Sequence, residues 1–186
     1  MIALTYQCQC RCVHCGSSLY RLDKKRELTR DEILELINSA KKLKVTAIYL
    51  FLGGEPLLLP ELPDYIRHAK TKGFLVKLDT NGLLLNEAKV KELRKSGIDR
   101  FGVSIDSPYG TIHDKLRGMN GIFNKAIEGI KYCRKYGIYC YVSVYATKEN
   151  LKNGELLQVI NMAKNLGAKT RILSTICSVN GLTVTI

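Results

Sequence analysis

The sequence predicts an α/β fold in which helices cover a parallel sheet, and three observations support this prediction. Six β-rich stretches alternate with amphipathic helical stretches along the chain. The helical stretches end on glycines shortly before the next strand, at Gly73, Gly97, Gly137 and Gly167. No internal repeat or linker interrupts the alternation, so it belongs to one domain. Strands that alternate with helices in this way require a parallel sheet with right-handed crossovers.

The individual elements follow from local patterns. The β-rich stretches cover residues 2–6, 47–52, 74–79, 100–105, 138–146 and 169–173. A capping box from Thr29 to Glu32 begins the first helix, and apolar residues follow it at helical spacing. The second and third helices are expected to begin near Pro60 and Asn86. The fourth and fifth are expected to carry Ile122 and Leu156 on their apolar faces, and Asn150 is expected to stand at a helix entry. The carboxyl ends of the strands then meet at one edge, where loops of such folds carry ligands.

Composition places the chain among globular proteins. Its 186 residues suffice for one core, with 46% hydrophobic and 25% charged residues. No apolar run reaches the length of a membrane span, and no basic leader precedes the first strand, so we expect a cytoplasmic protein. The net charge of +12 favours anionic partners, but its lysines are spread over helix faces and no basic–aromatic motif accompanies them. Neither nucleic acid nor a membrane is therefore expected as a partner.

The main chemical motif is a cysteine triplet near the N-terminus. Cys8, Cys12 and Cys15 have the spacing C-x3-C-x2-C, with Cys10 between the first two. Thiolates suit iron–sulfur clusters or zinc. A disulfide is disfavoured, because the cysteines number seven and no secretory signal precedes them. Zinc could use all four thiols, although structural zinc sites usually take two separated pairs of ligands. A 4Fe–4S cluster held by three cysteines would keep one iron open.

A second motif follows the second predicted strand. Gly53 and Gly54 there allow a ligand to approach the backbone closely, and Glu55 can place a carboxylate beside an ammonium group. A simple tight turn is the alternative interpretation. After the fourth strand, Ser104 and Asp106 are two residues apart and therefore point the same way.

These motifs together resemble the radical S-adenosylmethionine (radical SAM) superfamily, whose C-x3-C-x-aromatic-C motif follows the first strand of a partial barrel. His14 takes the aromatic place. The resemblance extends over essentially the whole chain and implies a partial (β/α)6 TIM-like barrel. The segment from His113 to Gly118 is similar to the H-D-x-x-R-G segment of relatives that carry a C-terminal SPASM domain.

The resemblance implies roles for particular residues. It assigns the metal to Cys8, Cys12 and Cys15, and S-adenosylmethionine to His14, Gly53, Gly54, Glu55, Asn81, Ser104, Asp106 and Arg117. Arg117 could grip the methionine carboxylate through its fork of donors, with a surface ion pair as the alternative. Asp106 could instead cap the following turn. Cys10 is expected to point away from its neighbours, and Cys133, Cys140 and Cys177 to be isolated.

The resemblance also implies an activity. Radical SAM enzymes reductively cleave S-adenosylmethionine at a 4Fe–4S cluster, and the resulting 5′-deoxyadenosyl radical abstracts hydrogen from the substrate. We expect a peptide or tetrapyrrole-like substrate and an electron donor such as ferredoxin or flavodoxin. Two alternatives stay open: a catalytically incomplete remnant that only binds the cluster or S-adenosylmethionine, and a zinc-binding structural module.

The C-terminal residues depart from the family pattern. We expect a core domain over residues 1–173 and an atypical tail over 174–186, in which Asn180-Gly181 predicts a tight hairpin. Relatives continue past the sixth strand with a helix and an extension. The sequence therefore indicates a minimal form or a chain that is cut short or altered near residue 172.

Overall fold

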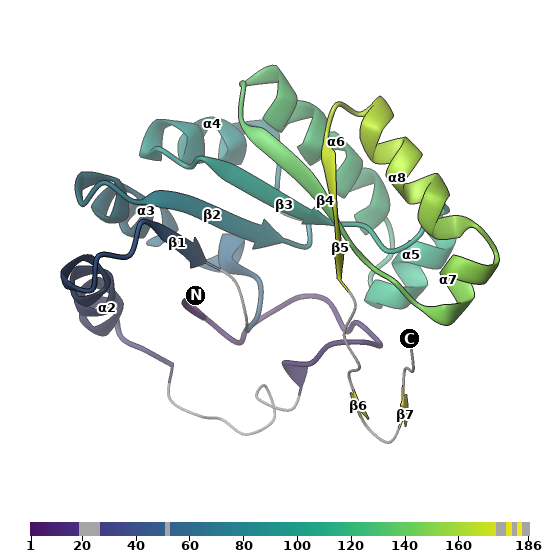
Figure 1. Ribbon diagram of the computed structural model, residues 1–186, viewed down its shortest axis with the longest axis horizontal. Helices are drawn as coiled ribbons and strands as arrows, with labels where there is room; N and C mark the ends of the chain where they lie inside the picture. The colour runs from purple at the N-terminus through teal and green to yellow at the C-terminus, as the bar shows by residue number, and fades with distance from the viewer. Residues whose placement is uncertain (19–26, 51–52, 174–177, 180–181, 184–186) are drawn as a thin grey trace.

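The sheet has five parallel strands in sequential order. The computed structural model describes residues 1–18, 27–50, 53–173, 178–179 and 182–183. The strands are β1 (Ala47–Leu50), β2 (Leu75–Thr80), β3 (Arg100–Ser104), β4 (Tyr139–Tyr145) and β5 (Lys169–Leu173), and each pairs in parallel with the next. Figure 1 shows helices α4, α6 and α8 on one face of this sheet and the N-terminal residues on the other side. The predicted parallel α/β fold is confirmed.

The helix before β1 and the helices between successive strands lie where the sequence predicts them. They are α2 (Arg30–Lys42), α3 (Leu62–Thr71), α4 (Glu87–Ser96), α6 (Ile122–Lys135) and α8 (Glu155–Asn165). The capping box of Thr29 and Glu32 begins α2, and Asn86 caps α4. A short α7 (Lys148–Lys152) begins with a second capping box formed by Thr147 and Asn150. The 3-10 turn η1 (Pro56–Leu58) and helix α5 (Gly110–Arg117) were not predicted.

One helix ends without the glycine that the sequence pattern led us to expect. After α4, Gly97 takes the left-handed conformation with φ of 94°. After α2 the same region of backbone space is occupied by Lys44, with φ of 59°. A side chain in this conformation costs roughly 1 kcal/mol relative to glycine, so the packing of α2 must offset that cost.

The first predicted strand is reduced to a single bridge. Ile2 pairs with Leu50, and its N–H donates to the Tyr49 carbonyl over 2.9 Å. Beyond it, the Tyr6 N–H and the Thr5 hydroxyl donate to the Glu27 carboxylate, over 2.6 and 2.8 Å. This carboxylate takes up the Tyr6 N–H, a donor that a longer ladder would use, so the segment lies beside β1 without forming a sixth strand. The predicted end of the second strand, residues 51–52, lies outside the described residues.

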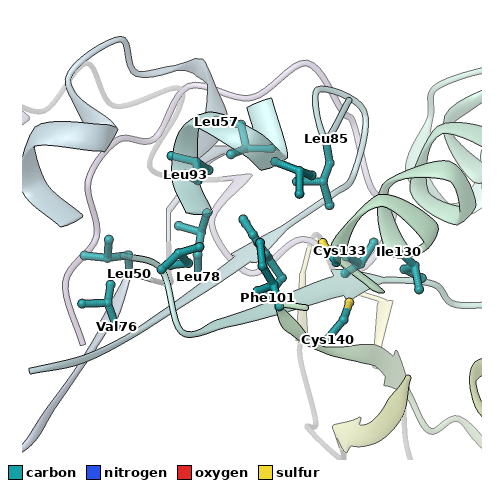
Figure 2. Packing of buried hydrophobic residues seen from close by; sticks show 14 of the residues in the cluster. Leu50, Leu57, Val76, Leu78, Leu85, Leu93, Phe101, Ile130, Cys133 and Cys140 are labelled. Carbon is teal, nitrogen blue, oxygen red and sulfur yellow. The ribbon is translucent and has the colours of Figure 1, made fainter. Parts of the chain in front are cut away.

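The two faces of the sheet differ in chemistry because side chains alternate along each strand. One face packs an apolar core against the helices, and it includes the fully buried Leu78, Phe101 and Ile130 (Figure 2). On the other face, Asp79 and Tyr141 flank Gly102 in register, and the Tyr141 hydroxyl donates to Asp79 over 2.6 Å. A Cβ on Gly102 would lie 2.0 Å from Asp79 Oδ1. The absence of a side chain there therefore makes room for the polar pair.

Two short strands pair near the C-terminus, on either side of the residues for which the sequence predicts a tight turn. Strand β6 (Ser178–Val179) pairs antiparallel with β7 (Leu182–Thr183), and Val179 lies opposite Leu182. Residues 180–181, as well as Cys177, are outside the described residues. In the part of the chain that the structure describes, no helix is long and apolar enough to span a membrane.

Candidate functional site

The two glycines after β1 hold the cysteine segment against the sheet. The N–H of Gly54 donates to the Thr5 carbonyl over 2.6 Å, and the N–H of Glu55 donates to the Gln7 carbonyl over 2.7 Å. A Cβ on Gly54 would lie 1.9 Å from the Gln7 oxygen, and one on Gly53 would lie 2.2 Å from the Thr5 oxygen. The glycines therefore permit a close approach of the backbone of residues 5–7, where the sequence had suggested the approach of a ligand. This approach brings the cysteines to the carboxyl end of β1.

Glu55 is a buried and fully oriented carboxyl group, with 1% of its surface exposed. Its Oε1 accepts hydrogen bonds from the Thr80 hydroxyl and the Leu57 N–H, over 2.7 and 3.1 Å. Its Oε2 accepts from the Asn81 N–H over 2.8 Å. Burial raises the pKa of Glu55 to about 7, although these hydrogen bonds act in the opposite direction. The group is therefore more than part of a tight turn, because three elements fix its direction.

Asn81 connects Glu55 with the first cysteine of the triplet. While its backbone binds Glu55, its side-chain amide donates to Cys8 Sγ over 3.7 Å. The Leu83 N–H donates to Asn81 Oδ1 over 2.9 Å, which turns the amide nitrogen toward the sulfur. The structure thus brings Cys8, Asn81 and Glu55 together from three parts of the sequence.

A second group of site residues surrounds Cys12. Arg117 Nη1 donates to Cys12 Sγ over 3.8 Å, and Arg117 Nε lies 2.7 Å from Asp106 Oδ2. His14 Nε2 lies 3.6 Å from the same Asp106 oxygen, and the His14 ring lies 4.7 Å from that of Tyr145. Burial lowers the pKa of His14. Burial alone would raise the pKa of Asp106, but the Arg117 guanidinium holds it below its usual value.

The ion pair of Arg117 and Asp106 contradicts the two alternatives to cofactor binding, a surface ion pair for Arg117 and a turn cap for Asp106. It is not a surface pair, because Arg117 is 7% exposed and Asp106 is 5% exposed. Asp106 does not cap a turn through its carboxylate; instead its backbone N–H donates to His113 Nδ1 over 3.1 Å. Burial lowers the pKa of His113 to about 4, so this ring is neutral at pH 7.

Ser104 lies apart from both groups. It is the last residue of β3, half-buried, and stands in register with Ser143 of β4. No hydrogen bond within the described residues joins its side chain to the cysteine loop. The structure therefore leaves its assignment to S-adenosylmethionine as a prediction.

The expectation for Cys10 is wrong. Its side chain is fully buried and hydrogen-bonds to both Cys12 and Cys8, which raises the pKa of the Cys10 thiol. Cys8, Cys10 and Cys12 therefore lie together, in a loop that bends at Gln9. The hydrogen bond from Cys10 lowers the pKa of Cys12 to about 7; burial opposes this shift, and Arg117 assists it.

Two further cysteines that were expected to be isolated are in contact. The thiols of Cys133, on α6, and Cys140, on β4, form a hydrogen bond inside the apolar core. The six residues between them cross from the helix to the strand, a connection that the sequence pattern could have indicated. Cys133 is fully buried, as its place on the apolar face of the helix predicts.

The residues present fit a cluster and a polar cofactor. Among the described residues, no group of three or more Cys, His, Asp or Glu side chains converges on a single metal ion. A cubane differs from one ion because each of its irons takes its own thiolate. Three thiols on one loop, two of them with hydrogen-bond donors from Asn81 and Arg117, match that need. Asp106 Oδ1 is buried without a hydrogen-bond partner in the described chain, so it can accept a hydroxyl or ammonium donor.

Sequence reasoning missed two contributions to the site. Glu27 anchors the segment that precedes the cysteines, but it follows a basic run and gives no signal. Helix α5 docks on the cysteine loop through backbone hydrogen bonds, from the Arg11 N–H to the Arg117 carbonyl and from the Val13 N–H to the Leu116 carbonyl, each 3.0 Å. Gly118, which ends this helix, was a usable signal for it.

Comparison with known proteins identifies the family. The family model described as the Radical SAM superfamily matches residues 2–160. The chain therefore belongs to the radical SAM superfamily. Enzymes of this superfamily use a 4Fe–4S cluster and S-adenosylmethionine, so the predicted cofactors are those of the family.

Two curated relatives come from Methanosarcina barkeri (strain Fusaro / DSM 804). An AdoMet-dependent heme synthase is 35% identical over 165 residues, covering 89% of this chain and 46% of the relative. An Fe-coproporphyrin III synthase is 32% identical over 150 residues, covering 81% of this chain and 37% of the relative. The chain thus spans less than half the length of these relatives.

Solved structures confirm the fold. Streptococcus suis SuiB matches with a TM-score of 0.78 at 19% identity, covering 97% of this chain and 40% of the other. Native anSMEcpe with bound AdoMet matches with a TM-score of 0.72 at 21% identity, covering 92% of this chain and 49% of the other. At such identity the likeness shows the TIM-like α/β architecture alone.

Proposed function

We propose that this chain is the catalytic core of a radical SAM enzyme, with the cluster on Cys8, Cys12 and Cys15. The observation that carries the proposal is the double contact of Asn81, which donates to Cys8 Sγ with its side chain and to Glu55 Oε2 with its backbone. It fixes a cluster ligand and a buried carboxylate at the same edge of the sheet. When bound, the cluster supplies the electron that cleaves S-adenosylmethionine reductively.

Each remaining residue has a binding or orienting task in this proposal. Glu55 keeps a lone pair on Oε2 for the ammonium group of S-adenosylmethionine, beside the backbone of Gly53 and Gly54. The unpaired Oδ1 of Asp106 accepts a cofactor hydroxyl. His14 packs against Tyr145 next to Asp106, with the two rings tilted by 53°, and thereby orients this edge of the site.

The substrate that we propose is a tetrapyrrole with acidic side groups. The support is the likeness to a heme synthase at 35% identity and to an Fe-coproporphyrin III synthase at 32%. The net charge of +12 suits a substrate that carries carboxylates. A peptide is the second candidate, but its support is structural likeness to SuiB at 19% identity and to anSMEcpe at 21%.

The proposal includes an electron donor such as ferredoxin or flavodoxin and a reducing, cytoplasmic setting, because the cluster must be reduced before it acts. It also keeps residues 1–173 as the core domain and residues 174–186 as a tail.

The decisive experiment is anaerobic reconstitution with iron and sulfide, followed by dithionite and S-adenosylmethionine. We expect a 4Fe–4S cluster and formation of 5′-deoxyadenosine and methionine, both absent from a variant with Cys8, Cys12 and Cys15 changed to alanine. The matched control is Cys10→Ala, which should keep its cluster because the proposal places the cluster on Cys8, Cys12 and Cys15 alone. A cluster without cofactor cleavage would support the incomplete remnant, and one zinc with no iron would support the zinc module.

The substrate class needs its own test. When iron-coproporphyrin III is added to the reconstituted protein, the Soret band of the porphyrin should shift on binding. The shift should be smaller at high salt, because the carboxylates of the porphyrin contribute to binding. Absence of binding while S-adenosylmethionine is still cleaved would reject the tetrapyrrole and keep the radical SAM core.

A further inference from the structure

The C-terminal end of α5 is held against the cysteine loop around Cys12 by backbone hydrogen bonds. The N–H groups of Arg11 and Val13, on either side of Cys12, donate to the carbonyls of Arg117 and Leu116 over 3.0 Å. A Cβ on Gly118 would lie 2.8 Å from the Arg11 carbonyl oxygen. Helix and loop therefore contact each other through their backbones, and the position of Cys12 depends on this contact.

The Arg117 side chain adds a contact with the sulfur atom of Cys12. Its Nη1 donates to Cys12 Sγ over 3.8 Å, and its Nε lies 2.7 Å from Asp106 Oδ2. The guanidinium is planar, so it holds these two anionic atoms in fixed directions. With both groups at most 7% exposed, solvent screens the interaction only weakly.

We propose that Arg117 is a positioning residue for the cluster itself, which holds the Cys12 thiolate in place and raises the cluster's reduction potential. This inference rests on the proposed function. Reduction adds one negative charge to a cluster, and hydrogen bonds and charges near its sulfurs set the potential at which this happens. A buried cation that donates to a ligand sulfur stabilises the reduced state more than the oxidised state.

Asp106 limits the effect of Arg117 on the reduction potential, and its substitution allows that effect to be tested. As the partner of Arg117 it neutralises much of the buried positive charge, and removing the arginine alone would leave a carboxylate unpaired beside the cluster. The potential of an Arg117 variant therefore reports both the lost donor and the exposed carboxylate. Comparison in an Asp106→Asn background isolates the arginine.

The test measures the midpoint potential of the reconstituted cluster by EPR-monitored redox titration without S-adenosylmethionine. Arg117→Gln should shift the potential to a more negative value, and Arg117→Lys should recover part of the shift. The matched control, Lys115→Gln, removes a charge from the same helix at an exposed position and should leave the potential unchanged. Asp106→Asn/Arg117→Gln should likewise be more negative than Asp106→Asn alone.

The outcomes separate this inference from the proposed function. If the parent protein assembles no 4Fe–4S cluster, both fail together. If it assembles one and cleaves S-adenosylmethionine, but the Arg117 variants keep the parent potential and only bind S-adenosylmethionine more weakly, the inference is overturned. Arg117 would then belong to the cofactor carboxylate. Should Arg117→Gln alone fail to fold, the comparison within the Asp106→Asn background decides.

Discussion

Asn81 and Glu55 are joined by a hydrogen bond of 2.8 Å from the Asn81 N–H to Glu55 Oε2, at the carboxyl ends of two neighbouring strands. The same asparagine donates its side-chain amide to Cys8 Sγ. A single residue after β2 thus contacts both Cys8, which we propose as a cluster ligand, and the carboxylate that we propose for the cofactor ammonium. The Leu83 N–H donates to Asn81 Oδ1 and so sets the direction in which the amide nitrogen points.

Asn81→Asp should weaken cluster binding. The change keeps the acceptor for the Leu83 N–H but replaces the donor to Cys8 by a carboxylate, which repels a thiolate. Loss of an outer hydrogen bond typically lowers metal affinity about 10-fold to 100-fold. The measurement is iron bound per chain at limiting iron. Asn86→Asp is the control, because aspartate caps α4 as well as asparagine does; equal iron binding in both variants would contradict the role of Asn81.

Gly54→Ala should displace the cysteine segment. Its Cβ would lie 1.9 Å from the Gln7 carbonyl oxygen, a backbone atom that cannot move without breaking the contact with Glu55. Overpacking of this kind costs about 3 kcal/mol, which urea unfolding can measure, and iron binding should fall with it. The control Gly137→Ala meets open space at φ of 65°, so it should lose only about 1 kcal/mol and keep its iron. Normal cluster assembly in Gly54→Ala would refute the idea that the close approach at Gly54 positions the cysteine segment.

The sequence was sufficient for the parallel sheet and the five helices between or before its strands, because periodicity and capping act locally. The sequence was insufficient where the position of a segment depends on a hydrogen bond to a side chain that is distant in sequence. The strand expected at residues 2–6 is absent as a ladder because Glu27, distant in sequence, accepts from Thr5 and Tyr6. Cys10 was misplaced because its side-chain direction depends on how the loop bends at Gln9, for which the spacing of the cysteines carries no signal.

The candidate site, too, contains both residues whose positions the sequence predicted and contacts that it did not predict. Cys8, Glu55 and Asn81 follow strands that the sequence predicts, and the structure brings them together. The pairing of Arg117 with Asp106 was not foreseen, since it requires knowing that α5 folds back onto the cysteine loop. A buried ion pair of this kind leaves no periodic pattern in a sequence.

Arg171→Gln should destabilise the polar face of the sheet. Arg171, on β5, pairs with Asp79 on β2 and donates to Ser143 on β4, so its loss leaves a carboxylate 8% exposed without its cation. Breaking such a pair costs about 2 kcal/mol here, below the range for full burial because the arginine is partly exposed. Urea unfolding measures this cost.

A second substitution separates charge from packing. Arg171→Gln/Asp79→Asn should recover part of the loss, because no unpaired charge remains. Lys70→Gln, which breaks the more exposed pair with Asp99, is the control and should cost about 0.5 kcal/mol. Strictly additive losses in the double variant would show that the two side chains contribute independently.

The stability of the protein should depend on pH through His113. Burial lowers its pKa to about 4, whereas an unfolded histidine titrates near pH ~6.5. Between these values the unfolded chain binds the extra proton, so this contribution is complete above pH ~6.5 and is lost as pH falls toward about 4. The difference in pKa corresponds to about 3 kcal/mol.

His113→Asn tests the assignment, because its side-chain oxygen can still accept the Asp106 N–H but does not titrate. The variant should be less stable at pH 7, since the ring packed against Phe123 is lost, yet its free energy of unfolding should fall less steeply than the parent's below pH ~6.5. Urea unfolding at several pH values gives both slopes. His68→Gln, which changes a less buried histidine, should keep nearly the parent slope. Parallel curves for His113→Asn and the parent would mean that His113 gains its proton equally in both states.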